Sequence, residues 1–129
     1  MQQIKFKAKN KNNHSWVKGD LMYGLHGDAM IRDKFFLAHD VINDTVCQFA
    51  GAHDSTGKDI YEGDVVSVRS PYEFGTILFT VIFNKTSLAF MFHNDEEGTY
   101  FLDEMIENYS FYESSCIKYN IHDKQKQKQ

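Results

Sequence analysis

The chain has 129 residues, the length of one ordinary domain, with 14 basic and 18 acidic side chains and a formal net charge of −4. This balance excludes a protein whose whole surface is a basic footprint for nucleic acid, although a local basic patch stays open. Aromatic residues make up 15% of the chain and there is one Pro, a composition typical of half-buried strands. We therefore expect a mainly β fold.

The compartment follows from the N-terminus and the cysteines. Residues 1–5 contain no apolar signal segment, and the longest apolar run, 77–83, is far shorter than the roughly 20 residues of a membrane helix. Cys47 and Cys116 have no metal-ligand spacing, so a reduced pair is the default. We expect a cytoplasmic protein with no membrane partner.

The first half of the chain predicts short strands joined by turns. Apolar and basic residues alternate over 4–9, and the turn at 10–13 leads to an extended segment that begins at Ser15, so the first two elements form a hairpin. A Gly-Asp pair between 21–25 and 29–32 predicts a second hairpin. Further strands are expected at 35–37 and 45–49, and no helix is expected.

The central stretch 51–64 is rich in turn-forming residues. Asp54 and Gly57 take the first and fourth positions of a type I turn, and a second corner at 62–64 precedes a strand that begins at Val65. We interpret this stretch as a hinge between two β-rich parts, residues 1–63 and 64–122.

The second half predicts a meander. Strands at 76–84 and 88–93 form an antiparallel pair with apolar residues on both faces, so each face needs cover from a barrel, a sandwich or a subunit interface. A short helix is expected at 102–107 and a last strand at 117–121. Residues 123–129 form a Lys/Gln tail that we expect to be disordered.

Candidate catalytic and metal-binding side chains have simpler structural explanations. Asp54, Asp59, Glu62 and Asp64 lack the spacing of a calcium loop, and turn formation accounts for them. Cys47 lies in an apolar strand, where an inert buried thiol is expected. No histidine forms a helical ligand pair with another ligand, and exposed imidazoles are expected at His14, His26, His39, His53, His93 and His122. We expect no catalytic residue, metal site, cofactor or small-molecule substrate.

The best case for nucleic-acid contact lies near the N-terminus. Lys5, Lys7 and Lys9 share one strand face, and Trp16 follows in the next segment, so ammonium groups could neutralise phosphates while the ring stacks on a base. A solvated lysine face over packed aromatic side chains explains the same residues.

Three segments carry a family likeness: 4–8, 44–51 and 54–66 resemble the YopX family of small phage and prophage proteins. The likeness runs in order from Ile4 to about Ile121, and Ala50 and Tyr119 depart from the usual threonine and glycine. The resemblance implies a mainly β protein with an N-terminal β portion and an SH3-like barrel from about Asp64, encoded by a phage or integrated element and so acting in the host bacterial cytoplasm. The family motif, a structural turn and a possible interaction surface, comprises Gly51, Asp54, Gly57, Lys58, Ile60, Tyr61, Glu62, Gly63 and Asp64. The family has no established activity, so no catalytic residue is implied.

Two hypotheses follow. The first is a non-enzymatic binding or scaffolding module that contacts a protein partner or a second copy through its apolar strands. The alternative is a nucleic-acid-associated accessory protein that uses the N-terminal lysines.

Overall fold

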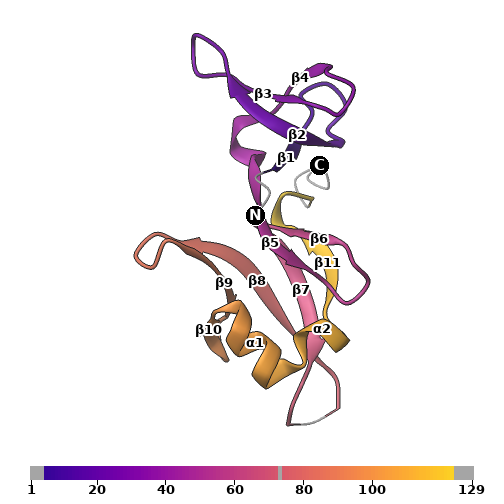
Figure 1. The fold of residues 1–129 in the computed structure, drawn as a ribbon, viewed down its shortest axis with the longest axis vertical. Coiled ribbons are helices and arrows are strands. Elements are labelled where there is room, and N and C mark those ends of the chain that lie inside the picture. The colour runs from indigo at the N-terminus through magenta and orange to yellow at the C-terminus, as the bar shows by residue number, and fades with distance from the viewer. Residues whose placement is uncertain (1–4, 73, 124–129) are drawn as a thin grey trace, which may run out of the picture. The chain divides into compact units, whose positions relative to one another are not determined.

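The computed structural model describes residues 5–72 and 74–123. The protein is mainly β, as predicted, with 51% of the described residues in the strands of two antiparallel sheets and two short helices (Figure 1). The elements are β1 (Phe6–Lys9), β2 (Trp16–Tyr23), β3 (Ala29–Arg32), β4 (Ala38–Asp40), β5 (Cys47–His53), β6 (Asp59–Tyr61), β7 (Asp64–Arg69), β8 (Thr76–Asn84), β9 (Ala89–Asn94), β10 (Gly98–Tyr100), α1 (Leu102–Tyr109), α2 (Phe111–Ser114) and β11 (Cys116–Asn120), with a 3-10 turn at Asn43–Thr45.

The chain divides into two compact units between Phe49 and Ala50. The boundary expected at residues 63 and 64 lies inside the second unit, because Ala52 and Ile60 of the β5–β6 hairpin belong to that unit's hydrophobic core. β5 serves both units: its first residues pair with β1, and its last residues continue into the hairpin with β6. Of the predicted tail, Asp123 belongs to the second unit, and 124–129 lie outside the described residues.

The first unit contains β4, β3, β2, β1 and the start of β5, which are neighbouring strands in this order of a six-stranded sheet that ends at β6. β2 pairs with β1 up to Gly19 and with β3 from Asp20 onward, so the predicted hairpins share one continuous strand. A Cβ at Gly19 would lie 2.0 Å from the carbonyl oxygen of Arg32, which only glycine avoids. A bridge between Asn10 and Val41 also connects the segment after β4 to the end of β1. The core is small: Ala8, Ala29, Ile31 and Val41 are fully buried.

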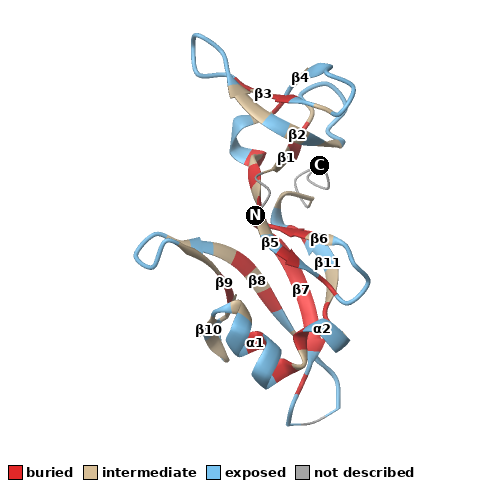
Figure 2. Cartoon of the chain, in the orientation of Figure 1, coloured by how far each residue is buried: buried red, intermediate tan, exposed pale blue. Residues whose placement is uncertain are grey.

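The second unit is a five-stranded meander in the order β10-β9-β8-β7-β11. One face carries Phe79, Val81 and Phe92, which are buried beneath Met105 of α1 and Phe111 of α2 (Figure 2). The other face is only partly covered, since the side chain of Leu78 is 44% exposed. The apolar residues of β8 predict that both of its faces are covered. The face that carries Leu78 is covered only in part.

The SH3-like barrel implied by the resemblance is not closed. In the described part of the second unit, β10 and β11 stand at opposite edges of an open sheet. The helices and the β5–β6 hairpin bury the core face, so the strands can shield their apolar side chains without closing on themselves.

The helical segment between β10 and β11 was predicted only in part. α1 begins at Leu102, as expected, and the backbone N–H of Phe101 donates to Glu104 Oε1 at 2.8 Å, which satisfies one donor at the helix start. Ser110 has a φ of 52°, and this left-handed residue separates α1 from α2. The sequence analysis did not foresee α2.

Candidate interaction site

The family motif is built into the interior of the second unit. Asp54 is 4% exposed, and its Oδ1 accepts bonds from the backbone N–H of Thr56 at 2.9 Å and of Lys58 at 3.0 Å. Its Oδ2 accepts the N–H of Ile117 in β11 at 3.1 Å, so one carboxylate closes the turn and holds a strand 63 residues further on. Burial raises the pKa of Asp54, but the bonds from Thr56, Ile117 and Lys58 outweigh it and lower the pKa below its ordinary value.

The second corner of the motif is fixed in the same way. Asp64 is 1% exposed; its Oδ2 accepts the N–H of Tyr61 at 2.8 Å and its Oδ1 accepts Asn120 Nδ2 at 3.0 Å. A Cβ at Gly63, where φ is 88°, would press against Asn120 at 3.2 Å. Ile60 and Tyr61 are also buried, while Gly51, Gly57 and Lys58 are exposed. The buried residues of the motif therefore close two turns and hold β11 by hydrogen bonds. Its exposed residues form no apolar surface.

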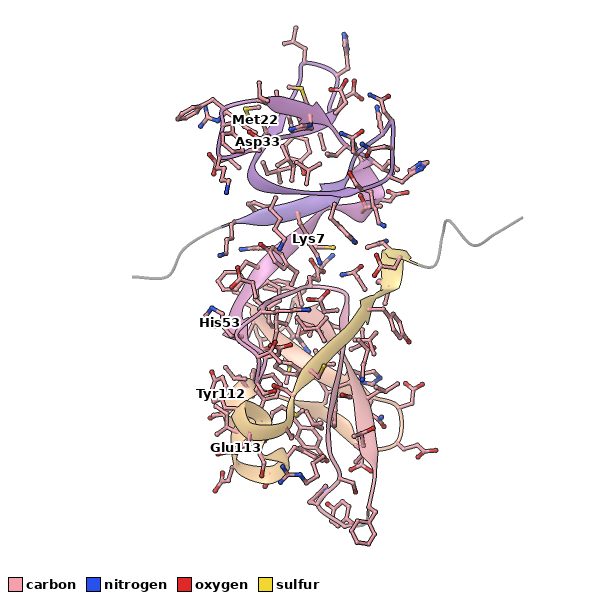
Figure 3. The ribbon with its side chains drawn as sticks, turned by 90° about the vertical axis from the view of Figure 1, so that its right-hand side faces the viewer. Lys7, Met22, Asp33, His53, Tyr112 and Glu113 are labelled. Atoms are coloured by element: carbon pink, nitrogen blue, oxygen red, sulfur yellow. The ribbon has the colours of Figure 1, made fainter. Side chains whose placement is uncertain are left out.

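The structure brings the four candidate nucleic-acid residues to one surface of the first unit. Lys7 Nζ and Lys9 Nζ lie 4.3 Å and 4.8 Å from the centre of the Trp16 ring, and Lys5 Nζ lies 4.6 Å from the Phe49 ring (Figure 3, Lys7). These are cation–π contacts, so the ammonium groups occupy ring surface on which a base would stack. Lys9 is 6% exposed, which also limits its reach to a phosphate.

Several of the remaining titratable groups form pairs. Three histidines pair with carboxylates: His39 with Asp33 at 2.8 Å, His53 with Asp59 at 3.1 Å and His93 with Asp95 at 2.9 Å. Cys47 is buried as expected, and its thiol lies 3.3 Å from the carbonyl oxygen of Thr45. Within residues 5–72 and 74–123, no group of three His, Cys, Asp or Glu side chains could hold a metal ion.

Three consecutive exposed apolar residues lie in a loop at a position where the sequence predicts a strand. Residues 33–37, here called the apolar loop, join β3 to β4 and leave Phe35, Phe36 and Leu37 exposed by 70%, 77% and 60%. The expected strand at 35–37 does not form. The loop lies with the pale blue, exposed segments of the first unit (Figure 2).

Asp33 gives the apolar loop one fixed conformation. Its Oδ1 accepts the N–H of Phe35 at 2.9 Å and of Leu37 at 3.1 Å, while its own N–H donates to the Leu37 carbonyl at 2.9 Å (Figure 3, Asp33). The hydrogen bond from His39, followed by that from the Leu37 N–H, lowers the pKa of Asp33 below its ordinary value, so the carboxylate stays charged near neutral pH. The loop is thus preorganised rather than slack.

Cations hold the aromatic rings of the loop. Lys34 Nζ lies 5.4 Å from the centre of the Phe35 ring, and the guanidinium of Arg32 lies 5.5 Å from that of Phe36. Arg32 also bonds Asp20 at 3.2 Å. The loop therefore presents apolar rings with positive charge at their sides.

Large apolar residues are also exposed in other turns, and Tyr72 and Phe74 in the β7–β8 connector are exposed by 79% and 104%. Leu25 is fully exposed between β2 and β3, and Leu88 is 75% exposed between β8 and β9, but their turn neighbours are mostly polar or glycine. Phe36 and Leu88 both have positive φ, at 66° and 57°. The apolar loop differs from these in that its three large apolar side chains are consecutive and lie on a turn closed by the hydrogen bonds of Asp33.

The sheet edges are poorly suited to pairing with another strand. β4, β6 and β10 have three residues each. On β11, Ile117 N–H donates to Asp54 and Asn120 N–H donates to Asp123, so these edge donors are already occupied. Short or blocked edges discourage the addition of a partner's strand. The apolar loop is therefore a better candidate for a binding site than the sheet edges.

A shallow depression lies on the partly covered face of the second unit. Two adjoining cavities of about 310 and 430 Å³ share Leu78, Asn94 and Glu96, and Asp95, Glu97 and Tyr72 line one or the other. Asn94 shapes the rim, since its Nδ2 donates to the Leu78 carbonyl at 2.8 Å and its Oδ1 accepts the N–H of Glu97 at 2.8 Å. We call this region the acidic hollow.

Comparison with known proteins supplies the family. The YopX protein family model matches residues 5–115. The chain belongs to the YopX family. The YopX match spans both units, contains the apolar loop and the motif, and ends at Ser115 just before β11, the region where the resemblance was thinnest. No curated protein was found to match this YopX chain. Among the residues described, no helix of this YopX protein has the length and apolar character to cross a membrane.

Sequence reasoning missed the functional candidates Phe35 and Phe36. Three consecutive apolar residues suit a buried strand as well as a loop, and the residues around them decide between the two. Asp33 was the available signal, because an aspartate two residues before such a run can accept the turn's own N–H groups.

Proposed function

We propose that this YopX protein is a non-enzymatic binding module that docks to a protein through the apolar loop. The observation that carries the proposal is the exposure of Phe35, Phe36 and Leu37 on a turn that Asp33 holds in one conformation. Large aromatic anchors on a rigid support are the usual centre of a protein interface, because little conformational freedom is lost on binding.

The backbone strain at Phe36 also supports binding through the apolar loop. A non-glycine residue in the left-handed region forgoes about 1–2 kcal/mol, and the exposed ring recovers little of that by burial within the unit. Folding alone would favour Gly or Asn at this position. A phenylalanine here is explained by a contact outside the chain.

The available energy suits a reversible interface. Burying most of two aromatic rings removes roughly 300 Å² of apolar surface, worth on the order of 7 kcal/mol before the cost of association is subtracted. That cost is about 4 kcal/mol or more, so the loop anchors binding and neighbouring contacts must complete it.

Site-specific photo-crosslinking followed by direct binding tests the proposal. Benzoylphenylalanine is placed at Phe35 and, in a control, at Leu25, and proteins crosslinked only from position 35 are purified. Titration calorimetry then compares the native chain with Phe35→Ser/Phe36→Asn and with the control Leu25→Ser. We expect at least a tenfold loss of affinity for the double variant and none for the control. A partner that binds the double variant as tightly as the native chain contradicts the proposal, as does binding of the loop to anionic vesicles in place of a protein.

A nucleic-acid role is the second candidate, supported by the assembly of Lys5, Lys7, Lys9 and Trp16 on one surface. If the lysines neutralise phosphates, DNA or RNA affinity falls steeply with salt, and the Lys5→Gln/Lys7→Gln variant has a shallower salt slope by about two. Lys85→Gln, in the exposed turn between β8 and β9 of the second unit, is the matched control. No binding at low ionic strength eliminates this candidate.

A further inference from the structure

The two units of the chain carry opposite charge. Residues 5–49 contain seven basic and five acidic side chains, whereas residues 50–123 contain four basic and thirteen acidic ones. The apolar loop lies in the first segment with cations beside its rings, and the acidic hollow lies in the second. Each surface therefore has a feature that complements the other.

The acidic hollow has room for a side chain of the loop and carries the opposite charge. Its floor is the half-exposed side chain of Leu78, and the larger cavity, about 430 Å³, has room for an aromatic ring. Glu96 and Glu97 stand at its rim, and the side chain of Asp95 is 97% exposed beside them. Arg69 lies opposite Thr76 across β7 and β8, but the three carboxylates leave this end of the sheet negative.

We propose that the partner of the apolar loop is a second copy of this chain, with Phe35 or Phe36 of one copy seated over Leu78 of the next. Lys34 and Arg32 then face Glu96 and its neighbours. This inference rests on the proposed function, since it names the partner of the same loop.

The geometry of such a contact is head to tail. The loop and the hollow are different surfaces, so a copy that donates its loop still has a hollow to offer, and association continues until a ring closes or a filament grows. Opposite charges at the rim steer the encounter and weaken with added salt.

Mixing of defective copies tests the inference. Sedimentation velocity follows the native chain, the loop variant Phe35→Ser/Phe36→Asn, the hollow variant Glu96→Lys and the charge-matched control Glu107→Lys on the exposed side of α1. We expect the native chain and the control to associate between about 10 µM and about 1 mM, and each defective variant to associate at least tenfold more weakly. Mixing the two variants restores a single interface, so it yields dimers and nothing larger.

Three outcomes overturn the inference: a native chain that stays monomeric at about 1 mM, defective variants that associate like the native chain, or a mixture that stays monomeric. Circular dichroism and thermal unfolding establish that each variant is folded, and Leu78→Gln replaces Glu96→Lys if the latter is not. If the native chain is monomeric but the loop variant still loses affinity for a crosslinked partner, the partner is not a second copy of the chain. The proposed function is then retained. If the loop variant associates with itself and binds crosslinked partners as the native chain does, both the proposed function and the self-association are contradicted.

Discussion

Asp54 connects turn formation to the packing of a distant strand. One buried carboxylate accepts N–H groups from Thr56 and Lys58 in its own turn and from Ile117 in β11. Bonds to a charged acceptor are stronger than neutral ones, which explains how the site tolerates a carboxylate at 4% exposure.

Asp54→Asn is expected to lower the free energy of unfolding by about 1–3 kcal/mol, because the amide offers one acceptor oxygen and turns a donor toward an N–H group. Since the pKa of Asp54 is lowered in the folded state, its contribution is present above the ordinary value of 3.8 and is lost as the pH falls through the folded pKa. The variant should therefore lose less stability than the native chain on acidification. Urea unfolding at pH 7 and near pH 3 measures both effects, and equal acid sensitivity of the two chains contradicts the assignment.

Ser115 presents the opposite situation, a buried hydroxyl with no hydrogen-bond partner among the described residues. The residue is fully buried, so its hydroxyl has lost water without replacing it. Ser115→Ala should leave stability unchanged or raise it by up to about 1 kcal/mol, while the backbone bond from Ser55 N–H to the Ser115 carbonyl remains. Chemical denaturation measures the free energy of unfolding of both chains. A decrease of more than about 1 kcal/mol in the variant would mean that the Ser115 hydroxyl makes a hydrogen bond.

At the scale of elements, the apolar loop depends on the contact between Asp33 and His39. The hydrogen bond from His39 is the largest contribution that lowers the pKa of Asp33, and bonds from the Leu37 and Phe35 N–H groups add to it. The loop's internal bonds are therefore complete above the ordinary value of 3.8 and are lost as the pH falls through the folded pKa.

His39→Ala should raise the pKa of Asp33 toward its ordinary value, and the backbone donors should keep it below that value. A carbon-detected NMR titration of the Asp33 carboxyl group measures the shift. His14→Ala, in a different turn, serves as the control. An unchanged Asp33 pKa in the His39 variant means that the backbone N–H groups alone set it.

Several elements could be predicted from local pattern, and others depend on distant partners. Alternation predicted β1, apolar runs bounded by turn residues predicted β8 and β9, and the Gly-Asp pair located the β2–β3 turn, since these signals lie within a few neighbouring residues. Gly19 lies within a strand and permits the close approach of Arg32, which no local signal reveals. The cover of one sheet face by α1, α2 and the β5–β6 hairpin also depends on contacts between segments far apart in the sequence, so the open sheet could not be foreseen.

At the scale of the whole molecule, the two units differ in how much core each contains. The first unit buries four small or medium apolar residues completely, whereas the core of the second includes Phe79, Phe92, Met105 and Phe111. Because hydrophobic stabilisation grows with buried apolar area, the second unit should hold most of the free energy of folding.

Fragments that each keep all of β5 test this difference. We expect residues 47–123 to unfold cooperatively on heating and residues 5–53 to show no cooperative transition, because the small core of the first unit cannot offset the entropy of ordering its backbone. Circular dichroism melting curves of both fragments and of the full chain provide the measurement. A sharp transition in the shorter fragment, or none in the longer, refutes the assignment.

The shared strand β5 also constrains how such a protein can change its parts. Recombination between two related genes at Phe49 and Ala50 would give a β5 whose two halves come from different proteins. One half would then pair with a sheet from the other parent. Recombinants that fold must therefore preserve the register of residues 47–53 on both sides at once. We therefore expect the two units to be inherited together, although each has a core of its own.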